Sequence, residues 1–117
     1  SYALIWMANG EPIGHSNINE IEFGKQAKMH LHLWKSDLRH TGLGLELIKM
    51  SLPYFFEKLE LEVLWCEPYA HNPAPNKTLK KLGFNFENKH INIPRTLNFE
   101  QETNRWKLTK EEYLELS

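Results

Sequence analysis

The most restrictive feature of this sequence is an amphipathic segment that lies between two strand-like segments. Residues 29–34 alternate between apolar and polar side chains, which is typical of a strand, and residues 61–68 are typical of a largely buried strand. Between them, apolar side chains recur at spacings near three and four, at Leu45, Ile48, Leu52, Phe55, Phe56 and Leu59. A strand, a helix and a second strand in this order predict a βαβ crossover with the two strands parallel.

Strand and turn signals on both sides of this unit predict antiparallel partners. Asn9-Gly10 is a strong hairpin signal between residues 2–7 and 13–18. Residues 85–93 and 103–108 are expected to form a last antiparallel pair. The fold class is therefore α/β (α+β), with a mixed, mostly antiparallel central sheet and one βαβ crossover, in a single domain over residues 1–117.

Two further helices are predicted from their boundary residues. Asn72 is a plausible N-cap, Pro73 suits the first helical position and Gly83 suits the C-terminal end. A short helix is expected to start at Thr109.

Composition excludes several classes of protein. Lys plus Arg (14) nearly balance Asp plus Glu (15), so no basic field indicates nucleic acid or an anionic membrane. No apolar stretch approaches the roughly 20 residues that span a bilayer, and no secretory leader is recognisable. Cys66 is the single cysteine, which fits a reducing compartment. We expect a cytoplasmic protein that binds neither nucleic acid nor membrane.

Two glycines, Gly42 and Gly44, directly precede the amphipathic segment. Glycine loses much conformational entropy on folding, so its position before a helix needs a reason. One reason is the close approach of an anion to the free N–H groups of the helix start. The other is a tight loop between strand and helix, and the glycines alone do not decide between them.

Two local motifs resemble those of a known family. Residues 39–44 (RHTGLG) match the (Q/R)-x-x-G-x-(G/A) signature of the GNAT superfamily of N-acetyltransferases. Residues 72–84 (NPAPNKTLKKLGF) are similar to the N-x-x-S-x-(R/K)-x-L-x-K-x-G-F segment of its branch that acetylates the N-termini of ribosomal proteins. The resemblance covers nearly the whole chain. It implies a GNAT-like acyl-CoA N-acyltransferase fold and transfer of acetyl from acetyl-CoA to a primary amine, of a peptide N-terminus or a small molecule, without a metal.

The resemblance also implies which residues hold acetyl-CoA. The pyrophosphate would lie on the backbone N–H groups of Arg39, His40, Thr41, Gly42, Leu43 and Gly44. Leu33 and Trp34 would flank the pantetheine where the two parallel strands separate, Asn72 would bond the pantetheine arm, and Lys77 would approach the CoA phosphates. Simpler interpretations remain open: Trp34 as a core residue, Asn72 as a helix cap and Lys77 as a solvated surface lysine.

Several residues of the sequence are candidates for the general base. His30 and His32 share one strand face and titrate in the useful range, while Glu67, Tyr69 and His71 follow the second parallel strand. Glu67 and His32 are the two candidates for the catalytic base, although such charges are more often only solvated. A base that acts through water is also possible. Cys66 is expected to be a buried small hydrophobe and not a nucleophile.

The sequence departs from the family pattern in two respects. The strand and two helices that usually precede the hairpin have no counterpart, which indicates a trimmed protein or a minimal member completed by a partner. Pro75 replaces the usual serine, and Leu79 stands where other branches place a tyrosine proton donor. These departures favour a non-catalytic CoA-binding module as an alternative. A small interaction domain, in which the glycine loop is only structural, is a further alternative. An unpaired sheet edge makes a homodimer plausible.

Overall fold

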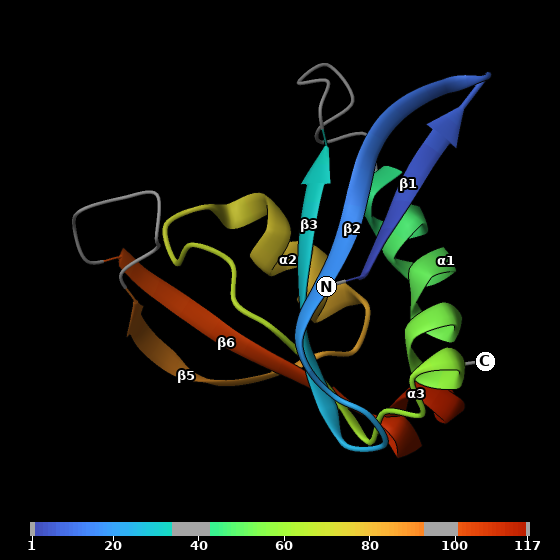
Figure 1. Cartoon of the computed structure of the whole chain (residues 1–117). Coiled ribbons are helices and arrows are strands. Elements are labelled where there is room, and N and C mark those ends of the chain that lie inside the picture. Colours follow the sequence, from blue (N-terminus) through green and yellow to red (C-terminus); the bar gives the residue numbers. More distant parts are fainter. Residues whose placement is uncertain (1, 34–42, 93–100, 117) are drawn as a thin grey trace.

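A computed structural model describes residues 2–33, 43–92 and 101–116 of the chain. Within these ranges it contains one six-stranded sheet and three helices (Figure 1). The elements are β1 (Tyr2–Ala8), β2 (Glu11–Glu22), β3 (Gln26–Leu33), α1 (Leu43–Lys58), β4 (Val63–Cys66), α2 (Pro73–Lys81), β5 (Asn85–Asn92), β6 (Gln101–Thr109) and α3 (Lys110–Glu115).

The strands lie in the order β1-β2-β3-β4-β6-β5. All neighbouring strands are antiparallel except β3 and β4, which are parallel and connected through α1. The structure thus confirms the mixed, mostly antiparallel sheet and the βαβ crossover. It also places two adjacent parallel strands at the centre of the sheet, where their carboxyl ends point in one direction.

The hairpin signal at the N-terminal end of the chain is confirmed. Asn9 (φ 52°) and Gly10 (φ 80°) both have positive φ, as the tight turns that suit twisted hairpins require. β2 is longer than predicted and extends over residues 11–22, because it pairs with β1 along one edge and with β3 along the other. Periodicity over residues 13–18 could not reveal this second pairing.

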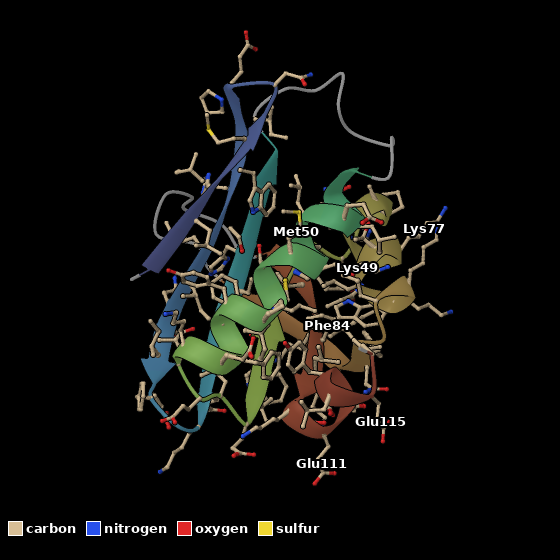
Figure 2. The ribbon with its side chains drawn as sticks, turned by 90° about the vertical axis from the view of Figure 1, so that its right-hand side faces the viewer. Lys49, Met50, Lys77, Phe84, Glu111 and Glu115 are labelled. Carbon is tan, nitrogen blue, oxygen red and sulfur yellow. The ribbon has the colours of Figure 1, made fainter. Side chains whose placement is uncertain are left out.

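The hydrophobic core lies between α1 and one face of the sheet. The predicted stripe is confirmed, with Ile48, Leu52, Phe55 and Phe56 buried and its two end residues partly buried. These side chains pack against buried residues of the strands, at Ile18, Ala27, Met29, Leu64, Cys66, Trp106 and Leu108. Figure 2 shows α1 lying lengthwise across the sheet with Met50 on its outer side. Burying such a side chain contributes about 1.5–3 kcal/mol, so this layer fixes the crossover in place.

The start and the end of α2 are as predicted. Pro73 is its first residue and Asn72 is the N-cap. Gly83 (φ 96°) follows the helix, where its amide donates to the carbonyl of Lys80 at 3.1 Å while the amide of Phe84 donates to that of Leu79 at 3.0 Å. This pair of bonds ends the helix in a Schellman motif.

The C-terminal elements also agree with the predictions. β5 and β6 form an antiparallel pair, although β6 begins before and ends after the predicted residues 103–108. Thr109 caps α3 through a capping box with Glu112. In the residues that the structure describes, none of the helices has the length and apolar character needed to cross a membrane.

Candidate active site

The two central parallel strands separate at one end. β3 pairs with β4 from Gln26 to Met29, opposite Val63 to Cys66. β4 ends there, whereas β3 continues to Leu33 with β2 as its neighbour on the far side (Figure 1). We call this point the fork. Beyond it, no described strand pairs with the β4-facing edge of β3, so backbone groups of residues 30–33 are available to a ligand.

A pocket of about 200 Å³ opens at the fork. Its walls come from the last paired residues of β3 and β4, from the segment that follows β4, and from the start of α2. The lining residues are Met29, His30, Cys66, Glu67, Pro68, Tyr69, Asn72 and Pro75. Glu67 and Asn72, two of the residues predicted from the sequence, therefore lie in one pocket.

Glu67 is the buried charge of this pocket. Only 6% of its side chain is exposed, and its Oε2 lies 3.2 Å from Lys28 Nζ and 3.3 Å from Arg105 Nε. Its Oε1 is buried and has no hydrogen-bond partner among the described residues. A buried carboxylate must be compensated, and here two cations do so through one oxygen. The other oxygen remains able to accept a proton or a hydrogen bond.

The two cations are themselves held in place. Lys28 also pairs with Glu20, at 2.9 Å. Desolvation acts to lower the pKa of Lys28, but hydrogen bonds to Glu20 and Glu67 outweigh it and raise that pKa above its ordinary value. The Arg105 guanidinium lies 4.4 Å above the ring of Trp65. β3 and β6 thus each contribute one fixed cation to the carboxylate that follows β4.

His30 is a pocket residue that the sequence placed beside His32 without selecting it. Desolvation by the surrounding protein and the nearby Lys28 ammonium hold the pKa of His30 below its ordinary value of 6.5. The imidazole is therefore neutral near pH 7 and can accept a proton. His32 lies on β3 opposite His15, but its side chain is outside the described structure. The alternation of residues 29–34 placed His30 on the same strand face as His32, and this was the signal that could have selected it.

Asn72 occupies the N-cap position of α2 without using its side chain for capping. Its backbone is extended, and the side chain makes no cap hydrogen bond. Asn72 therefore has the position of a helix cap, but capping does not account for its side chain. The exposed side chain lines the pocket and is available to a ligand.

Asn76 is the residue that the sequence analysis missed. Its Nδ2 donates to the carbonyl oxygens of Tyr69 (3.1 Å) and Asn72 (2.7 Å). Its Oδ1 accepts from Asn104 Nδ2 (2.9 Å) and Trp106 Nε1 (2.8 Å). It lies at an unspecified position of the family segment, so the only available signal was a second asparagine one helical turn after the N-cap.

Cys66 ends β4 and is fully buried, which confirms the expectation for this residue. Burial, followed by the charge of Glu67, raises the pKa of its thiol to about 12. The thiolate is therefore not populated near neutral pH, and Cys66 does not act as a nucleophile.

The structure describes only some of the remaining predicted residues. Leu43 and Gly44 are the first residues of α1, and the backbone of Leu33 ends β3. Trp34 and residues 39–42 (Arg39, His40, Thr41 and Gly42) lie outside the described residues. Lys77 is exposed and points away from α2 (Figure 2).

The two departures from the family pattern lie in different surroundings. Pro75 lines the pocket, whereas Leu79 is fully buried in the core and cannot reach a ligand. Among the described residues, no group of three His, Cys, Asp or Glu side chains could hold a metal ion.

The central parallel strands separate over a pocket that the start of α2 helps to line, which agrees with the acetyltransferase fold that the motifs indicated. The chain belongs to the acetyltransferase (GNAT) domain family, whose model matches residues 1–85. This membership assigns it to the acetyl-CoA-dependent N-acetyltransferases.

Solved structures share the fold at low sequence identity. A chimera of the Vibrio cholerae spermidine N-acetyltransferase SpeG and hSSAT superposes with a TM-score of 0.83 at 20% identity, over 96% of this chain and 69% of that one. The aminoglycoside acetyltransferase AAC(6')-Ib in complex with coenzyme A gives a TM-score of 0.79 at 18% identity, over 97% and 68% of the two chains. No curated protein matches the sequence.

Proposed function

We propose that this protein transfers acetyl from acetyl-CoA to a primary amine at the fork between β3 and β4. The observation that carries the proposal is the pocket at this point, which combines free strand backbone with the unpaired buried Oε1 of Glu67. A ligand that extends along β3 can bond the strand as a neighbouring strand would, and its reacting end then lies beside the carboxylate.

Four features of the chain would hold acetyl-CoA, which supplies the thioester-bound acetyl group. Residues 30–33 of β3 offer backbone donors and acceptors to the pantetheine amides. The side chain of Asn72 makes no cap hydrogen bond and lines the same pocket. Residues 39–44 end at the start of α1, where unpaired N–H groups and the helix dipole favour a pyrophosphate. Lys77 adds an exposed positive charge for the remaining phosphate.

The acceptor amine must lose a proton before it attacks. In the proposed reaction, the neutral amine nitrogen forms a bond to the acetyl carbonyl carbon and the C–S bond breaks. The proton that the nitrogen then loses passes through water to the leaving sulfur, which departs as the CoA thiol. Glu67 Oε1, directly or through a water molecule, is our first candidate for the group that receives the amine proton. His32 is the second candidate, and His30 lies on the same strand with a neutral ring.

The ion pairs of Glu67 bear on the class of acceptor. Two cations already face its carboxylate, and their positive charge disfavours a third cation, a protonated amine, in the same place. An α-amino group, with a pKa near 7.7–8.0, is therefore a more suitable acceptor than a lysine, with a pKa near 10.4. The resemblance of residues 72–84 to the branch that acetylates ribosomal-protein N-termini supports a peptide N-terminus as the acceptor. The names of the structural neighbours instead support a small-molecule amine, such as spermidine or an aminoglycoside.

Turnover of acetyl-CoA tests the proposal. We would compare a peptide with a free N-terminus, its N-blocked lysine-containing twin, and spermidine, from about pH 6 to about pH 9. We expect the free N-terminus to react faster than the blocked lysine peptide, with a rate that rises through the pKa of the α-amine. Faster acetylation of the blocked peptide would overturn the preference and indicate a stronger base.

A non-catalytic CoA-binding domain is the second candidate. It is supported by Pro75 in the pocket and by the burial of Leu79, because neither position can donate a proton to the leaving thiolate. CoA binding without turnover on any amine would favour this function. Absence of CoA binding would instead leave the alternative of an interaction domain.

A further inference from the structure

We infer that Asn76 is a positioning residue, which holds the pocket-lining segment of residues 67–72 against β6 and thereby leaves the Asn72 side chain free for the ligand. This inference deepens the proposed function and rests on it where it concerns CoA. The geometry of the segment can be tested separately.

Four hydrogen bonds fix the orientation of the Asn76 amide. The Nδ2 group of Asn76 donates to two carbonyl oxygens of the segment after β4, those of Tyr69 and Asn72. The Oδ1 atom accepts from the Asn104 and Trp106 side chains of β6. Because one side of the amide faces two acceptors and the other faces two donors, only one orientation satisfies all four groups.

The Asn76 amide anchors the start of α2, which the side chain of Asn72 does not do. A side chain at the N-cap normally accepts from the first helical turn, but Asn72 makes no such bond. Asn76 instead anchors the start of α2 by bonding the Asn72 carbonyl at 2.7 Å. With the helix start held in this way, the Asn72 side chain can line the pocket.

Among the described residues, few other hydrogen bonds hold the end of the segment that approaches α2. Two backbone bonds join it to β6, from the Ala70 amide to the Glu102 carbonyl (2.9 Å) and from the Asn104 amide to the Pro68 carbonyl (3.0 Å). They fix the middle and the beginning of the segment. The part that approaches α2 is held by the Asn76 amide and by a bond from the Asn72 amide to the Tyr69 carbonyl at 3.1 Å. Loss of the Asn76 donors would therefore shift Asn72 without unfolding the segment.

The substitution Asn76→Asp removes the hydrogen bonds that position the segment of residues 67–72 while it keeps the size of the side chain. Aspartate has the same size and keeps one oxygen toward Asn104 and Trp106, but it places its second oxygen against the two carbonyls that Asn76 now bonds. Thr78→Val is the matched control on the same helix, because the Thr78 hydroxyl bonds only the Ala74 carbonyl within α2 in the described structure.

We expect Asn76→Asp to raise the KM for acetyl-CoA by about tenfold with less than a threefold change in kcat, while Thr78→Val leaves both within about twofold. The decisive measurement is a double-mutant cycle with Asn72→Ala. If Asn76 acts through Asn72, the double variant binds CoA no more weakly than Asn72→Ala alone. Fully additive losses, or unchanged KM in Asn76→Asp, would overturn the inference.

NMR of the full chain gives a readout that does not depend on CoA. In Asn76→Asp, the backbone amide resonances of residues 69–72 should shift while the Trp106 indole N–H remains protected from exchange. Unchanged resonances over residues 69–72 would refute the positioning role, whatever the activity. A wild-type protein that shows these contacts but binds no CoA would contradict the proposed function alone.

Discussion

The two halves of β3 differ in their neighbours, and the difference separates stability from ligand binding. From Gln26 to Met29 the strand is paired on both edges, and its inward side chains Ala27 and Met29 are buried in the core. From His30 to Leu33 it is paired with β2 alone. Substitutions beside the first half should therefore change the free energy of unfolding, whereas substitutions around the second half should change affinity and rate.

The largest expected effect is on stability, beside the paired half. Leu64 is opposite Ala27 in the β3–β4 register and is fully buried. Leu64→Ala should reduce the free energy of unfolding by about 2–5 kcal/mol, because it leaves a cavity in the core. Urea titration measures this loss. Ile5→Ala, at a strand position that is 54% exposed, is the control and should change stability by less than about 1 kcal/mol.

The second prediction concerns the carboxylate at the fork. Glu67→Gln keeps the shape of the side chain but removes the proton acceptor, so kcat/KM should fall by about 100-fold. Glu102→Gln is the matched control, since Glu102 also forms an ion pair, with Lys89, but does not line the pocket. Equal rates for Glu67→Gln and the control would show that Glu67 is not the base.

The third prediction concerns the glycines before α1. Gly42→Asp would introduce a side chain and a negative charge where the pyrophosphate is proposed to lie. Calorimetry should show at least a tenfold loss of CoA affinity, about 1.4 kcal/mol, with an unchanged circular dichroism spectrum. If the variant binds CoA as tightly as the parent protein, the pyrophosphate does not lie there.

The smallest expected effect is at the exposed Lys77. Lys77→Ala should weaken CoA binding by about threefold at low salt and less at high salt, because exposed charges are screened. Lys110→Ala, an exposed lysine at the start of α3, is the control. Equal losses for CoA and dephospho-CoA would exclude a contact with the ribose phosphate.

Most of the fold was predictable because its signals are local. The stripe of α1, the Asn9-Gly10 turn and the residues that bound α2 act within a few positions of the chain, and the structure confirms each of them. The extension of β2 beyond Ile18 was not predictable, because those residues are held by a second neighbouring strand, β3. Pairing across strands leaves little trace in local periodicity.

The candidate site was only partly predictable for the same reason. Glu67 was selected for its place after the second parallel strand and Asn72 from the resemblance, and the two share one pocket. The ion-pair partners of Glu67, Lys28 and Arg105, are distant in sequence and lie on two other strands. Asn76 bonds the Asn72 backbone through a side chain for which the family segment specifies no residue. Such contacts arise from tertiary packing, which one sequence does not reveal without a three-dimensional arrangement.

Because Cys66 is buried, the reactivity of its thiol can report the opening of the fork. As the only cysteine in the sequence, it lies at the end of β4 with its thiol shielded and protonated near neutral pH. An alkylating reagent can react with it only when the end of β4 becomes transiently exposed, so the labelling rate under native conditions reports the free energy of that opening. A ligand that bridges the fork should slow this labelling in proportion to its occupancy. Mass spectrometry of a single modified site could then follow binding without any substitution in the chain.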